Sequence, residues 1–166
     1  MKLHRWYGTA LNMILAALVI SGAAFYAVHS RSKNPFLEIR DANSGKLYGK
    51  WPLKETGEFA VEFNHSVHQS PVRESFIVKD KTIRPVAVRF SSFGAGMQSD
   101  LEEGQTLSRD GDALVITGYS SSFGALNYIV GTVSDHLLFI NGETVSLRKL
   151  CGKNAHITVR YTGGKN

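Results

Sequence analysis

From Phe36 onward, short apolar stretches alternate with turn residues, which is the pattern of β-strands. In residues 59–63, for example, large apolar residues alternate with small or charged ones, as in a strand with one buried face. No segment beyond residue 35 shows the apolar period of a helix. Roughly ten short strands with regular turns predict an all-β domain, either an antiparallel sandwich or a partly closed barrel.

Turn signals divide this part of the chain into strands and hairpins. Asn141-Gly142 lies between two apolar runs and predicts a tight hairpin with a primed turn. Asp110-Gly111 and Asp80-Lys81 mark two further turns. The predicted strands cover residues 36–40, 46–52, 59–63, 74–78, 83–90, 113–117, 137–140, 144–147 and 157–161.

The N-terminal residues 1–29 have a different pattern. Residues 8–28 contain no charged side chain, and a helix of this length crosses a hydrocarbon core about 30 Å thick. Aromatic residues lie at both ends of the run, where a spanning helix meets the two membrane interfaces. We therefore expect a retained single-pass anchor. The alternative is a cleaved export signal that ends in the small residues Ser21-Gly22-Ala23.

The charge distribution supports this organisation. The formal net charge is +5, yet no acidic residue precedes Glu38, so the basic excess flanks the apolar run. Such a distribution does not suit nucleic-acid binding, which needs a basic face on the folded domain. We predict a linker at residues 30–35, a β-domain at 36–162 outside the cytoplasm and a flexible tail at 163–166. With a retained anchor the domain faces the periplasm from the inner membrane; with a cleaved signal it is secreted there.

Cys151 is the only cysteine, so no disulfide can form within the chain. It follows the strand-like run of residues 144–150. We interpret it as a small packed apolar side chain rather than as a nucleophile.

The densest polar cluster runs from Asn64 to Glu74 and contains the candidate binding residues His65, Ser66, His68 and Glu74. The two histidines and the glutamate suggest metal ligands, but residues three apart on a strand point to opposite faces. Hydrogen-bonded loop histidines, or a His65–Glu74 pair that orients a polar ligand, are the other interpretations. We predict no metal and no cofactor. Ser66 lies in no nucleophile-elbow pattern, so we predict no enzymatic activity.

A tetrapeptide occurs twice, at Ser92-Phe93-Gly94-Ala95 and Ser122-Phe123-Gly124-Ala125, 30 residues apart. Its glycines allow close approach of a ligand to the backbone, and successive N–H groups can bind an anion. The interpretation we favour is a pair of strand-end turns, each of which buries its phenylalanine. A binding role predicts that both segments line one cavity. The candidates are Ser92, Gly94, Ala95, Gly96, Ser122 and Gly124.

Three motifs resemble one bacterial family of the domain-of-unknown-function series, number 1850. They are His65-Ser66-Val67, Ser70-Pro71-Val72 with Glu74, and the run from Phe90 to Gly96. The resemblance spans residues 36–135. It implies a small protein with an N-terminal signal or anchor, often encoded beside tripartite ATP-independent transporters of the TAXI type.

Together these observations predict a non-enzymatic, membrane-anchored accessory protein outside the cytoplasm. Its partners would be the membrane, through the N-terminal helix, and a transporter membrane subunit or solute-binding protein. The alternative is a periplasmic module that binds a small ligand or an anion. A metal-dependent or serine hydrolase is a third, less favoured function.

Overall fold

The computed structural model describes residues 35–65, 70–91 and 100–163. The predicted N-terminal helix and nearly all of the linker lie outside these ranges, as does most of the tail. In the described ranges, no helix is both long and apolar enough to cross a membrane.

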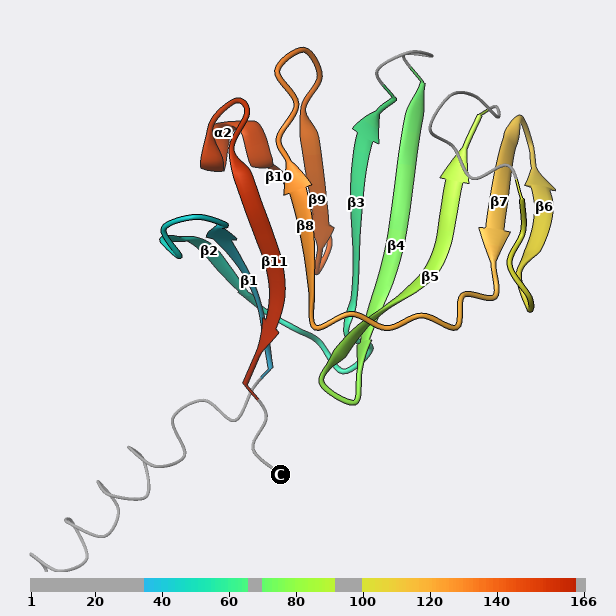
Figure 1. Cartoon of the computed structure of the whole chain (residues 1–166), viewed down its shortest axis with the longest axis horizontal. Helices are drawn as coiled ribbons and strands as arrows, with labels where there is room; N and C mark the ends of the chain where they lie inside the picture. Colours follow the sequence, from blue (N-terminus) through green and yellow to red (C-terminus); the bar gives the residue numbers. More distant parts are fainter. Residues whose placement is uncertain (1–34, 66–69, 92–99, 164–166) are drawn as a thin grey trace, which may run out of the picture. The chain divides into compact units, whose positions relative to one another are not determined.

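Within these described residues, eleven strands form two antiparallel sheets (Figure 1). The four-stranded sheet has the order β2-β1-β11-β8 and contains β1 (Phe36–Asp41), β2 (Leu47–Pro52), β8 (Ala125–Ile129) and β11 (His156–Thr162). The seven-stranded sheet has the order β10-β9-β3-β4-β5-β7-β6. Its strands are β3 (Glu58–Asn64), β4 (Pro71–Lys79), β5 (Thr82–Phe90), β6 (Thr106–Asp110), β7 (Ala113–Thr117), β9 (His136–Ile140) and β10 (Glu143–Ser146).

The all-β prediction is confirmed, and of its two architectures the structure is the sandwich. The partly closed barrel is wrong, because both sheets are open, with β2 and β8 at the edges of one and β6 and β10 at the edges of the other. One isolated antiparallel bridge between Ile83 and Phe123 connects the start of β5 with the segment before β8. Closure of a barrel would need continuous pairing between edge strands, which a single bridge does not supply.

The hairpin predictions agree with the structure. Asn141 and Gly142 join β9 to β10 with φ values of 56° and 86°, as in a primed turn. Asp80 and Lys81 join β4 to β5 and also have positive φ, at 51° and 62°. Neither is a glycine, and the turn is supported by the ion pair of Arg84 with Asp80 at 3.1 Å.

One short helix, α2 (Leu147–Cys151), was not predicted. The run of residues 144–150 has the composition of a strand, but the strand ends at Ser146, whose hydroxyl accepts a hydrogen bond from the Lys149 amide. This N-cap turns the chain away from the sheet. Cys151 lies half-buried at the end of the helix, and burial raises the pKa of its thiol to about 11. The thiol is therefore protonated at neutral pH.

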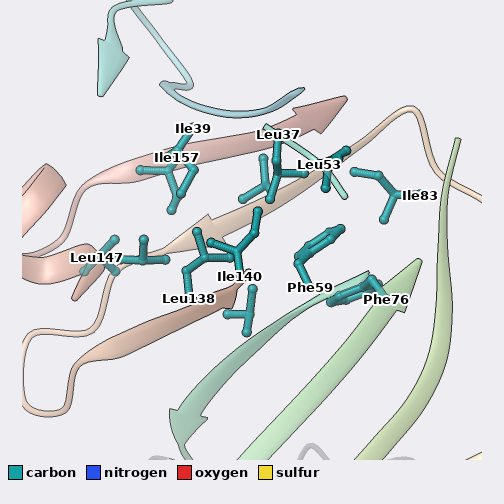
Figure 2. Close-up of a cluster of buried hydrophobic side chains, with 13 residues drawn as sticks. Leu37, Ile39, Leu53, Phe59, Phe76, Ile83, Leu138, Ile140, Leu147 and Ile157 are labelled. Atoms are coloured by element: carbon teal, nitrogen blue, oxygen red, sulfur yellow. The ribbon is translucent and has the colours of Figure 1, made fainter. Parts of the chain in front are cut away.

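The main hydrophobic core lies between the two sheets (Figure 2). Leu37 and Ile157 of the four-stranded sheet face Leu138 and Ile140 of the seven-stranded sheet, and all four are buried. The rings of Phe59 and Phe76 stack with their centroids 5.2 Å apart. Each such side chain contributes about 1.5–3 kcal/mol through removal of apolar surface from water.

A second, smaller cluster of buried side chains does not lie between the sheets. Its buried members, Val72, Phe90 and Ile116, come from β4, β5 and β7 of the seven-stranded sheet. The end of β5, together with β7 and β6, extends beyond the four-stranded sheet (Figure 1). On this part of its inner face the larger sheet has no strand opposite to it, and a cavity forms there.

Candidate functional site

The cavity lies on the inner face of the seven-stranded sheet, beside the edge strand β8. Its volume is about 780 Å³, which is within the usual range for small-molecule sites. The second hydrophobic cluster forms part of its wall. Aromatic side chains from four strands and from the segment between β7 and β8 also line it: Phe63, Phe76, Phe90, Tyr119, Phe123 and Tyr128.

Glu74 is an acidic side chain within this apolar wall. It lies on β4, paired with Val61 of β3 on one side and with Val88 of β5 on the other. The hydroxyl of Tyr128 on β8 donates a hydrogen bond to Glu74 Oε2 at 2.6 Å. This bond joins the middle of the larger sheet to the edge of the smaller one.

Burial dominates the electrostatics of this pair. It raises the pKa of the Glu74 carboxyl, and the hydrogen bond from Tyr128 offsets part of the increase. Burial, together with the nearby Glu74 charge, also raises the pKa of Tyr128. The pKa of Tyr119 is raised by burial and then by Glu74 and Glu102. An ionised carboxylate in this position is costly unless a charged or hydrogen-bonding partner compensates it.

Phe123 belongs to the repeated tetrapeptide, and the interpretation that each segment buries its phenylalanine is wrong for this copy. The Phe123 side chain is 41% exposed and lines the cavity. Its backbone is held by two hydrogen bonds of 2.8 Å to Ile83, one in each direction. The bridge therefore places an exposed aromatic ring at the cavity.

Two glycines shape the wall where β7 ends. Gly118 has a φ of 83°, and a Cβ atom there would lie 2.2 Å from the carbonyl oxygen of Gly104. Each glycine precedes a residue that lines the cavity, Tyr119 and Gln105 respectively. The close backbone approach therefore determines where these two side chains lie.

His136 lies behind the cavity wall, and its role was missed because it is distant in sequence from His65. The registry of β3 with β9 places it opposite Phe63, and the two rings stack at 5.0 Å. Its Nδ1 accepts a hydrogen bond from the Gly131 amide at 3.1 Å, and burial lowers its pKa. A neutral imidazole thus supports the Phe63 ring and also meets Tyr128 edge-on.

Of the candidates from sequence, His65 and Glu74 line this cavity, and Ser122 and Gly124 flank the lining residue Phe123. Glu74 receives its hydrogen bond from Tyr128, and the His65 amide donates to the carbonyl of Ser70. The remaining candidates lie outside the described residues: Ser66, His68, Ser92, Gly94, Ala95 and Gly96. Tyr119 and Tyr128 were not singled out, because nothing in the sequence marks a tyrosine whose partner is 54 residues away.

No group of three His, Cys, Asp or Glu side chains in the described ranges is arranged to hold a metal ion. A second hollow, of about 510 Å³, lies on the outer face of the seven-stranded sheet. Lys54, Arg73, Glu58 and Glu143 line it, so both signs of charge are present. The Arg73 guanidinium lies over the Phe139 ring at 4.0 Å.

Comparison with known families gives one match. The model of the family described as "Domain of unknown function (DUF1850)" matches residues 59–147, which is more than half of the chain. The chain belongs to the DUF1850 family. No curated protein and no solved structure matches it.

The DUF1850 match begins within β3 and ends at the first residue of α2. It therefore contains the whole seven-stranded sheet except Glu58, and β8 of the smaller sheet. All the described residues that line the inner-face cavity fall within it. The DUF1850 stretch thus includes the cavity, whereas β1, β2 and β11 lie outside it.

We expect Gly118→Ala to destabilise the protein by about 1–3 kcal/mol, because the new Cβ meets a backbone oxygen and an alanine is strained at positive φ. Urea unfolding of the full chain, followed by tryptophan fluorescence, measures the change. Gly124→Ala is the matched control, since a Cβ there meets no atom within 4 Å. Equal stabilities of the two variants would contradict the proposed role of the Gly104–Gly118 contact.

Glu74→Gln tests how much the burial of the Glu74 carboxylate lowers the free energy of unfolding. Burial makes the pKa of Glu74 higher in the folded protein than in the unfolded chain, so the native state binds the proton more tightly. The free energy of unfolding therefore falls as the pH rises from the pKa of the unfolded state through the pKa of the folded state. The amide of the variant accepts the Tyr128 hydrogen bond but does not titrate. Its free energy of unfolding should exceed that of the wild type by a growing amount as the pH rises above about 4, the pKa range of an unfolded glutamate.

Urea titrations at several pH values measure this difference, and Glu103→Gln at an exposed position is the control. A stability difference that stays constant over this range would show that Glu74 does not titrate differently in the folded state.

Proposed function

We propose that this β-domain is a non-enzymatic module that binds a small organic molecule in the cavity beside β8. The observation that carries the proposal is the pairing of Glu74 with Tyr128 inside an aromatic wall. A mostly apolar cavity with a few convergent polar groups is the usual form of a small-molecule site. A titratable group shifted by burial in such a cleft is a further mark of one.

The placement of Phe123 and Glu74 supports the same function. The Phe123 side chain is 41% exposed at the cavity, and a bound ligand would remove its ring from water. Glu74 loses solvation in the folded protein and accepts a hydrogen bond from Tyr128. A ligand that contacts both residues would cover the exposed Phe123 ring and also give the Glu74 carboxyl a further polar partner.

We further propose that the full chain is a membrane-anchored extracytoplasmic accessory protein of a TAXI-type tripartite transporter. The apolar residues 8–28 and the gene neighbourhood implied by the family resemblance support this role. A ligand-binding domain outside the cytoplasm suits a protein that assists solute uptake. The cavity could then present a solute or sense its presence.

Ligand binding can be tested with a panel of small fluorinated fragments that carry ammonium, carboxylate or neutral head groups. Fluorine NMR of the full-length protein in nonionic detergent, with detergent alone as a blank, detects line broadening on binding. Ser121→Trp places bulk at a half-buried residue that lines the cavity, and Ser120→Trp places it at the exposed neighbour. Fragments that use the cavity should lose binding at least tenfold in the first variant only.

Two results would contradict the binding function: no fragment binds the wild type, or both tryptophan variants bind as the wild type does.

The transporter role predicts co-purification. Affinity isolation of the full chain from native membranes, followed by mass spectrometry, should recover transporter subunits together with an uncleaved bait. A version in which residues 8–28 are replaced by an unrelated spanning segment separates helix contacts from domain contacts. Isolation of a cleaved chain alone would refute the anchored accessory role and leave the cavity proposal standing.

A further inference from the structure

We infer that the ligand of the inner-face cavity is an organic cation, with an ammonium group beside Glu74 and an apolar or aromatic body against the surrounding rings. This inference rests on the proposed ligand-binding function and names the class of molecule that would bind.

The charges at the cavity support a cationic ligand. Among the described residues that line it, the two carboxylates Glu74 and Glu102 are present and no lysine or arginine is. The internal segments 66–69 and 92–99, outside the described ranges, contain no lysine or arginine in sequence either. The hollow on the outer face of the same sheet differs, since Lys54 and Arg73 line it beside two glutamates.

The aromatic side chains suit the same ligand. Six of them line the cavity, from four different strands and the segment between β7 and β8. The face of an aromatic ring attracts a cation, and the attraction is larger where water is excluded. Phe123 is exposed at the cavity, while the Phe63 ring is held in place by its stacking on His136.

The geometry at Glu74 leaves an acceptor for the ligand. In the described part of the chain, the hydrogen bond to this carboxylate comes from Tyr128 and ends on Oε2. Oε1 can therefore accept an N–H from an ammonium group while the Tyr128 bond remains. A cation there would stabilise the ionised carboxylate that burial disfavours. Charge-assisted hydrogen bonds of this kind are about twice as strong as neutral ones.

The same arrangement disfavours an anionic ligand, which was one of the alternatives from sequence. A carboxylate or phosphate would approach Glu74 and Glu102 at close range. Like charges repel strongly where burial excludes water, as it does at Glu74, and the described lining offers no guanidinium or ammonium to compensate that charge.

Three fluorinated probes of nearly equal size test the inference: para-fluorophenethylamine, which is an ammonium ion at pH 7, para-fluorophenethyl alcohol and para-fluorophenylacetate. Fluorine NMR titrations use the full-length protein in nonionic detergent. The ammonium probe should bind at least tenfold more tightly than the acetate. Glu74→Gln should weaken the ammonium probe about tenfold and change the alcohol less than twofold, since the neutral amide cannot form a charge-assisted hydrogen bond with the ammonium group.

Glu103→Gln changes an exposed acid that does not line the cavity, so it is the control and should leave all three affinities unchanged. If the alcohol or the acetate binds more tightly than the ammonium probe and Ser121→Trp abolishes that binding, the cavity binds ligands but the cation inference is wrong. If Glu74→Gln leaves the affinity for the ammonium probe unchanged, the cation inference is also wrong. If no probe binds, both the inference and the proposed function fail.

Discussion

The unequal width of the two sheets is the constraint on which the rest of this structure depends. Four strands lie opposite seven, so the main core covers only part of the inner face of the larger sheet. Where the smaller sheet ends at β8, an apolar surface without a facing strand would remain exposed to water at a cost. The chain reduces this cost by a second cluster around Phe90 and Ile116 and by the segment that leads from β7 to β8. The part of the inner face that remains uncovered forms the cavity.

The bond between Tyr128 and Glu74 lies at this boundary and connects the two layers. A carboxyl group there has no equivalent among the buried side chains of the main core, which are aliphatic or phenyl. Replacement of such an acid by an apolar residue of similar size is often neutral or stabilising in proteins. The proposed binding role would account for an acid at this position, because a cationic or donor ligand would stabilise the buried carboxylate.

The predictable part of the fold was local. Asn141-Gly142 and Asp80-Lys81 determine their turns through the backbone angles that they adopt, and alternation within residues 59–63 determines which face of β3 is buried. The end of β10 at Ser146 was not predictable from residues 144–150, because the capping hydroxyl also donates to Asp135, which comes from another part of the chain. The exposure of Phe123 depends likewise on its bridge to Ile83.

By itself the sequence determined that the domain is all-β, and it singled out His65, Glu74 and the second Ser-Phe-Gly-Ala segment as candidate binding residues. These are properties of spacing and composition within short windows. Only the tertiary structure decided that the smaller sheet stops at β8, that Tyr128 meets Glu74 and that His136 supports Phe63. Such contacts depend on strand order and registry between distant segments, and the same alternating pattern is compatible with many pairings.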